Sequence, residues 1–208
     1  MAFIKNWLKK RSAESTLQYA ATCAVLAKQT GEKEFLLKGI EALSKEIEKG
    51  YEEPTSSKLH WARATLLLQQ PTTKADYEKA REDLKKVLLN NEKVLEETSK
   101  EGIDIKKEIY EDLAEVEFRL GNYDDSARYF LKICLGESVA DEIESPEVLH
   151  YTKGFMFDKL GKKKDALKEY EKVIEISPDL ESKSLEQLSS LQSSAPEFTS
   201  RIKKINSF

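Results

Sequence analysis

Apolar side chains recur three and four residues apart along most of the chain. Two runs share this spacing in full: Ala80, Leu84 and Val87, and Ala166, Tyr170 and Val173. Because an α-helix completes a turn in about 3.6 residues, such spacing places the apolar side chains on one helical face. The pattern therefore predicts a succession of amphipathic helices.

Two segments of the chain are similar position by position, namely KLHWARATLLLQQ (58–70) and VLHYTKGFMFDKL (148–160). Each contains Leu-His-aromatic and a basic residue, and each is followed by a turn and a second amphipathic segment. A third copy lies between them and a weaker one precedes them. Self-similarity of this kind is typical of stacked repeats. We expect four helical hairpins, with helices at 14–30 and 32–49, 57–70 and 74–99, 105–120 and 122–138, and 147–160 and 162–177.

The ends of the predicted helices carry turn residues. Gly31, Gly121 and Gly161 follow the first helix of three hairpins, where a left-handed residue is needed. Pro71 takes this place in the second hairpin, and Pro178 ends the last one. Beyond Pro178 we expect a capping helix near 181–192 and a short helix near 196–205.

The composition agrees with a helical protein whose charge is uneven. Charged residues make up 35% of the 208 residues, whereas Gly and Pro number only 8 and 5. The net charge of −4 argues against a general nucleic-acid binder. Residues 101–150 hold most of the acidity, with 14 Asp or Glu against 5 Lys or Arg. An acidic segment on a helical scaffold favours a basic partner over RNA.

The hairpins resemble tetratricopeptide repeats. The resemblance is carried by Gly154, Phe157, Gly161, Ala166, Tyr170 and Pro178 in the last hairpin, and by Tyr110, Leu113, Ala114, Gly121, Tyr123 and Ala127 in the third. The third departs from the family at Glu117. The resemblance implies an all-α, right-handed superhelical stack of four hairpins plus a C-terminal capping helix. The expected regions are a basic amphipathic leader at 1–13, an array at 14–178 (repeats 14–50, 57–99, 105–138 and 147–178), and a cap and tail at 179–208.

Arrays of this family bind peptides in the concave groove formed by the first helices. By resemblance, the site predicted here is a non-enzymatic peptide-binding groove for a basic and apolar partner segment. Aromatic residues, among them Trp61, Tyr151 and Phe155, are expected to be exposed as anchors, and carboxylates to select positive charge. An alternative is that the aromatics pack between hairpins and the acids form a solvated face. The predicted groove residues are Trp61, Leu68, Glu108, Glu111, Asp112, Glu115, Phe118, Tyr151, Phe155 and Lys159.

The N-terminal residues MAFIKNWLKKR suggest a second interaction. Phe3, Ile4, Trp7 and Leu8 share one helical face, and basic residues accompany them. Such a segment can lie on an anionic membrane surface, which would make the protein a peripheral membrane-associated adaptor anchored through residues 1–11. It also fits the acidic groove of its own chain or of a second copy, the latter giving a homodimer. The remaining alternative is a leader that packs on the first helix or frays.

The chain shows no pattern of catalytic chemistry. No phosphate-binding loop, dinucleotide glycine motif or nucleophile elbow occurs, so we expect no enzymatic activity and no cofactor. His60 and His150 stand at equivalent repeat positions without further ligands at zinc-binding spacing, so no metal site is expected. Cys23 and Cys134 stand singly, which with the absence of a signal sequence or long apolar run predicts a cytoplasmic scaffold or adaptor.

Overall fold

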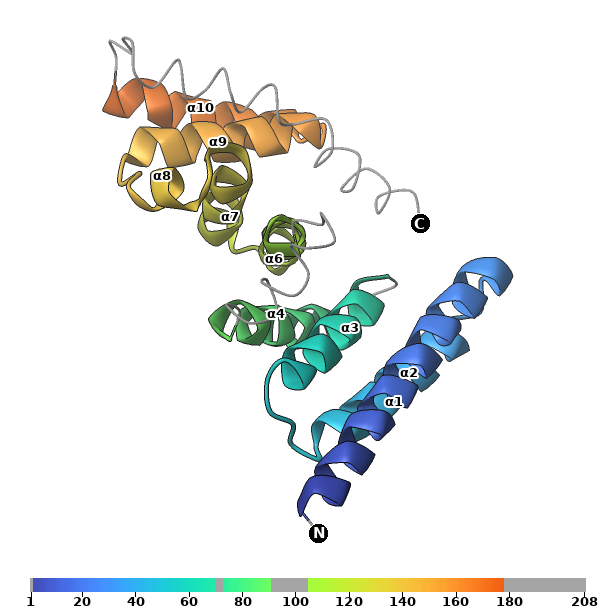
Figure 1. The fold of residues 1–208 in the computed structure, drawn as a ribbon. Coiled ribbons are helices and arrows are strands. Elements are labelled where there is room, and N and C mark those ends of the chain that lie inside the picture. The colour runs from blue at the N-terminus through green and yellow to red at the C-terminus, as the bar shows by residue number, and fades with distance from the viewer. Residues whose placement is uncertain (1, 70–72, 91–104, 178–208) are drawn as a thin grey trace. The chain divides into compact units, whose positions relative to one another are not determined.

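The computed structural model describes residues 2–69, 73–90 and 105–177, with side chains from Lys9 onward. Throughout these ranges the secondary structure is helical and no strand occurs, which confirms the predicted all-α fold of paired helices (Figure 1). The helices are α1 (Ala2–Thr30), α2 (Lys33–Ile47), α3 (Thr55–Gln69), α4 (Lys74–Leu89), α6 (Ile105–Leu120), α7 (Tyr123–Leu135), α8 (Glu137–Asp141), α9 (Pro146–Lys159) and α10 (Lys163–Ile176).

Most helix ends lie close to their predicted places. Gly31, Gly121 and Gly161 each adopt a positive φ, of 75°, 85° and 73°, as expected of residues that end a helix. Two differences stand out. The first helix begins at Ala2 rather than at 14 and continues without a break. The short helix α8 was not predicted. The residues after Asn90 in the second hairpin and the predicted capping helix lie outside the described residues.

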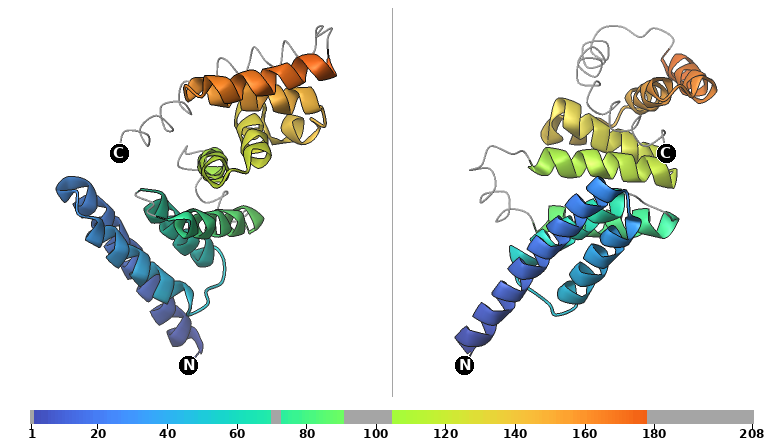
Figure 2. Two further views of the ribbon diagram at one scale, coloured as in Figure 1. Left: turned by 180° about the vertical axis from the view of Figure 1, so that it is seen from behind. Right: turned by 90° about the vertical axis from the view of Figure 1, so that its right-hand side faces the viewer.

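The chain divides into two compact units, Met1–Ile109 and Tyr110–Phe208. In the first unit α1 packs on α2, α2 on α3 and α3 on α4, so neighbouring helices lie side by side (Figure 2). The core positions of three helices recur every seven residues, which is close to two helical turns. They are Ala13, Ala20 and Ala27 in α1, Leu36 and Leu43 in α2, and Leu59 and Leu66 in α3. Small residues on α1 allow the larger ones opposite to pack closely.

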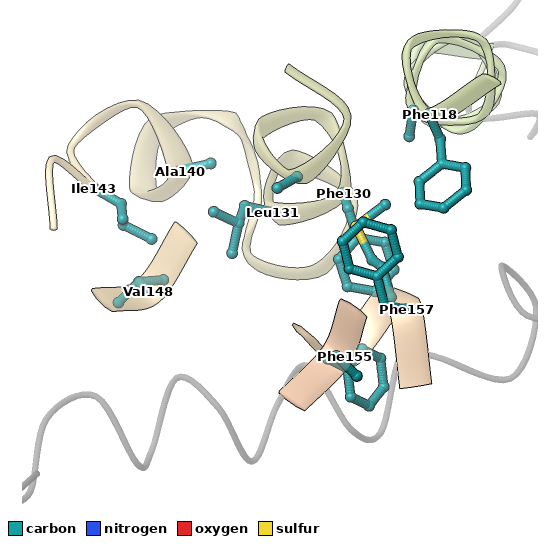
Figure 3. Packing of buried hydrophobic residues seen from close by; sticks show 12 residues of the cluster. Phe118, Phe130, Leu131, Ala140, Ile143, Val148, Phe155 and Phe157 are labelled. Atoms are coloured by element: carbon teal, nitrogen blue, oxygen red, sulfur yellow. The ribbon is translucent and has the colours of Figure 1, made fainter. Parts of the chain in front are cut away.

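The second unit has a more aromatic core. The α7 helix packs on α8 and α9, and α9 packs on α10. Figure 3 shows the phenylalanine rings of this core, in which Phe118 lies 5.6 Å from Phe157 and Phe130 lies 6.2 Å from Phe155, measured between ring centroids. The hydroxyl of Ser126 donates to the carbonyl of Ala114 at 2.5 Å and so joins α7 to α6.

Glycines inside two helices mark the closest contacts. A Cβ atom at Gly154 in α9 would lie 2.6 Å from the Tyr170 ring in α10, and a Cβ at Gly39 in α2 would lie 2.7 Å from Leu66 Cδ1 in α3. Real Cβ atoms do not approach so closely, so glycine is required if these neighbours keep their places. The small position predicted at Gly154 is thereby explained by the Tyr170 ring.

Candidate functional site

The residues of the predicted peptide groove come from both units. Trp61, Leu68 and Glu108 belong to the first unit, and the remaining residues belong to the second. A groove that runs across both units therefore stays a prediction. Each residue can still be judged by its exposure and its contacts within its own unit.

Three residues of the predicted groove are buried. Phe155 is 5% exposed and Phe118 is 8% exposed, and both belong to the aromatic core of the second unit. Glu115 is 9% exposed, with an oxygen 4.0 Å from Arg119 Nε. The expectation that Phe155 is an exposed anchor is wrong, because its ring packs against Phe130 instead. Burial likewise leaves the side chains of Phe118 and Glu115 little surface for a partner.

The other predicted residues keep part of their surface. Trp61 in α3 and Tyr151 in α9, which follow the two repeated histidines, are both half-buried. Lys159 is exposed, and its Nζ lies 5.2 Å from the centroid of the Phe155 ring. The other residues of the predicted groove are half-buried as well, namely Leu68, Glu108, Glu111 and Asp112.

His60 belongs to a buried polar cluster in the first unit. Its Nδ1 lies 2.6 Å from Oδ1 of Asp83, whose carboxylate also accepts hydrogen bonds from Arg63 Nε and Nη2, each at 2.8 Å. Burial alone would raise the pKa of Asp83, but the hydrogen bonds from Arg63 and His60 outweigh it and lower the pKa. An ionised carboxylate only accepts, so Nδ1 of His60 carries the proton. Arg63 Nη1 also donates to Ser44 Oγ in α2 at 3.1 Å.

His150 belongs to a similar cluster in the second unit. Its Nδ1 lies 2.7 Å from Oε2 of Glu169, and Lys153 and Lys172 lie 3.2 Å and 2.8 Å from the same carboxylate. Burial opposes ionisation of Glu169, yet hydrogen bonds from His150 and the two lysines lower its pKa to about 2. Lys153 Nζ also pairs with Asp124 of α7 at 2.7 Å.

The two clusters show what the repeated histidines do. Asp83 and Glu169 each follow the small residue of their helix by three positions, and each is bound by a histidine and a cation from the preceding helix. Arg63 also contacts Ser44 of α2, and Lys153 also contacts Asp124 of α7. Each cluster therefore joins three helices. Across the described residues, no group of three or more His, Cys, Asp or Glu is arranged to hold a metal ion.

A groove that the sequence did not indicate lies within the second unit. It has a volume of about 430 Å³. Tyr123 at the start of α7 and the buried Phe157 of α9, which is 5% exposed, line its aromatic side, and α10 provides a charged wall. The wall residues are Asp165, Lys168, Glu169, Glu171, Lys172 and Glu175.

Sequence reasoning missed this groove because it selected one face of each first helix. The sequence predicts an exposed side chain at Phe155, whereas Phe157, two residues further on, is expected only to match the repeat. Two residues rotate a helical side chain by about 200°, so the two rings lie on different sides of α9. The signal available in the sequence was the series of acidic residues along 165–175, on the second helix of the hairpin.

The basic N-terminal segment is continuous with the first helix. Lys9 Nζ lies 3.4 Å from the carbonyl oxygens of Lys49 and Gly50 and 5.9 Å from the centroid of the Tyr51 ring. This lysine therefore contacts the chain just beyond α2. None of the helices in the described part of the chain is both long and apolar enough to span a bilayer.

Comparison with known proteins identifies one hairpin. Residues 148–180 match the tetratricopeptide repeat, over a range that contains nearly all of α9 and the whole of α10. No curated protein sequence matches the chain. The fourth hairpin predicted from the sequence is therefore a repeat of this type, and the all-helical fold of the other hairpins agrees with it.

Proposed function

We propose that this chain, which belongs to the tetratricopeptide-repeat family, is a non-enzymatic scaffold that holds a basic and apolar segment of a partner protein. Repeats of this family are typically interaction modules. Stacking of the hairpins buries one face of each helix, so side chains on the remaining faces are available to a partner. The bound segment would lie along the first helices of the hairpins.

One observation carries the proposal. Trp61 and Tyr151 stand at equivalent positions in α3 and α9, and both large aromatic side chains remain half-buried rather than fully enclosed. Partly exposed aromatic residues are frequent anchors of protein interfaces. The half-buried carboxylates of Glu108 and Glu111 on α6 add negative charge that favours a cationic partner.

The test compares the proteins retained by two full-length charge variants. Glu108→Lys with Glu111→Lys changes the acidic row of α6, which consists of Glu108, Glu111, Asp112 and Glu115. Glu14→Lys with Glu32→Lys makes the same charge change at exposed residues of the first unit. Glu115 is left unchanged because its burial would make reversal disruptive. Partners are identified by affinity capture and mass spectrometry, and their lysine- or arginine-rich segments are titrated as synthetic peptides.

We expect the partner peptide to lose at least about tenfold in affinity for the first variant and to keep its affinity for the control, because close charges of like sign oppose binding. Equal affinity for wild type and both variants would show that the acidic row is a solvated face. Helicity measured by circular dichroism verifies that each variant folds.

A second candidate, membrane attachment through residues 1–11, is favoured by one observation. The helix α1 extends to Ala2, so the apolar residues near the N-terminus stand on a continuous helix. A basic amphipathic helix of this kind binds anionic lipid surfaces. Flotation with vesicles containing phosphatidylserine compares wild type with Trp7→Ser and Leu8→Ser. Equal flotation of the two proteins would eliminate the membrane candidate.

A further inference from the structure

We propose that the groove formed by α7, α9 and α10 is a second binding site, and that it receives an arginine side chain of a partner protein. Its lining residues are not among those of the predicted peptide groove, so the inference does not depend on the proposed function. Its volume of about 430 Å³ lies in the range of small-ligand sites, roughly 300–1,000 Å³.

The aromatic side of the groove already attracts a cation. Phe118, Tyr123 and Phe157 form a cluster in which the Tyr123 centroid lies 5.2 Å from that of Phe118 and 4.9 Å from that of Phe157. Lys162 Nζ lies 5.2 Å from the Phe118 centroid and 6.0 Å from the Phe157 centroid. Such distances are those of cation–π contacts. Tyr123 is 36% exposed, so part of its surface remains available to a second cation.

The opposite wall is negatively charged on balance. Its four carboxylates outnumber its two lysines. Glu169 is already neutralised by His150, Lys153 and Lys172 and does not contribute to recognition. The exposed carboxylates that remain on this wall are Asp165, Glu171 and Glu175; Lys168 lies on the same wall, and Lys162 lies at the aromatic side.

An aromatic side facing a carboxylate wall suits arginine better than lysine. The guanidinium group is planar, so one face can stack on a ring while its edge donates two hydrogen bonds to a carboxylate. It is also more weakly hydrated than an ammonium group, so less hydration is lost when it enters a partly enclosed groove. Tyr123 would provide the stacking surface, and Asp165 or a neighbouring acid on α10 would accept the hydrogen bonds.

The experiment uses two tripeptides and the full-length protein. Acetyl-Leu-Arg-Leu-amide is the probe, and acetyl-Leu-citrulline-Leu-amide is its neutral counterpart of almost the same shape. NMR follows the ring signals of Tyr123 and the backbone amides of residues 163–176. A single side-chain contact predicts weak binding, with a dissociation constant in the millimolar range. We expect saturable shifts with the arginine peptide and at least about fivefold weaker binding of the citrulline peptide, from the loss of cation–π and charge attraction.

Two variants locate the site. Asp165→Asn, Glu171→Gln and Glu175→Gln together should weaken arginine-peptide binding at least about fivefold, because the attracting charges are removed. The control, Glu14→Gln, Glu32→Gln and Glu48→Gln, removes the same charge from exposed residues of the first unit and should leave binding unchanged. Tyr123→Leu keeps an apolar side chain in the aromatic cluster but removes the ring, and should also weaken binding.

Three outcomes would overturn the inference. Equal binding of the two peptides would show that positive charge is not recognised, and equal loss in the acidic variant and its control would indicate a nonspecific charge effect. The third is binding that appears only after Arg201, Lys203 and Lys204 are replaced by glutamine. That result would assign the groove to the basic residues of the chain's own C-terminal segment rather than to a partner.

Discussion

The two polar clusters hold equivalent carboxylates with different cations. In the first unit Arg63 donates from two nitrogen atoms to both oxygens of Asp83, and the Asp83 side chain is only 2% exposed. In the second unit Lys153 and Lys172 surround Glu169, and the Glu169 side chain is 13% exposed. A guanidinium group fixes the direction of its partner, whereas an ammonium group acts as a point charge. The first cluster should therefore depend on geometry, and the second should depend mainly on charge.

The largest effect is expected from Asp83→Ala. This change leaves Arg63 and His60 without their carboxylate in a buried site, which should lower the free energy of unfolding by about 3–5 kcal/mol. Both tryptophans of the chain, Trp7 and Trp61, lie in the first unit, so tryptophan fluorescence during urea denaturation reports on it. The neighbouring exposed residue Glu82, changed to alanine, is the control and should cost less than about 0.5 kcal/mol. A loss for Asp83→Ala no larger than the control's would contradict the structural role of the cluster.

A smaller effect that depends on pH is expected from Glu169→Gln. Because the folded protein holds the pKa of Glu169 at about 2, below the ordinary value of 4.5, its ionised form stabilises the fold above pH 4.5. This contribution declines as the pH falls from about 4.5 toward 2. At pH 7 the variant should lose about 1–3 kcal/mol of unfolding free energy, as when a partly buried charged group loses its hydrogen bonds.

The measurement for Glu169 is chemical denaturation followed by far-ultraviolet circular dichroism at several pH values. The difference between wild type and Glu169→Gln should shrink on acidification through this window. Glu171→Gln, at an exposed residue of the same helix, is the control and should show no such trend. A difference that stays constant from pH 7 to pH 2 would mean that the charge of Glu169 is not what stabilises the unit.

The smallest effect comes from exchanging the cations. Arg63→Lys should lower the unfolding free energy by about 1–2 kcal/mol, because one ammonium cannot replace the two hydrogen bonds to Asp83 and the one to Ser44. Lys153→Arg should lower it by less than Arg63→Lys does, because the second cluster depends on positive charge more than on the fixed direction of the donors. Denaturation of both variants by urea gives the comparison. Equal losses in the two variants would remove the proposed distinction between the units.

Much of the fold could be predicted because it depends on local spacing. The positive φ at three helix ends favours glycine, and the ring of Tyr170 leaves no room for a Cβ atom at Gly154. Both constraints are therefore visible in the sequence as glycines. The equivalence of His60 and His150 was also visible. Their partners cannot be identified from the sequence, because Asp83 and Glu169 resemble every other acidic residue of a helix surface until the helices are paired.

The choice of helix face was harder to predict. Phe155 and Phe157 are both large, apolar and two residues apart, and only the packing of α9 against α7 and α10 shows which one borders a groove. The exposure of the acidic row on α6 was equally hard to predict, since Glu111 is half-buried whereas Glu115, about one helical turn later, is buried. The spacing of apolar residues predicts which face of a helix is buried, but it does not distinguish positions as close as Phe155 and Phe157 or Glu111 and Glu115.

The most direct test of this account is hydrogen–deuterium exchange, followed by mass spectrometry, on wild type, Asp83→Ala and Glu169→Gln. The central claim is that the buried polar residues hold the hairpins together and that each cluster serves its own unit. It predicts that Asp83→Ala loses protection in α2, α3 and α4, and that Glu169→Gln loses protection in α7, α9 and α10. Unchanged protection in both variants, or the same uniform loss over the whole chain in each, would contradict the claim.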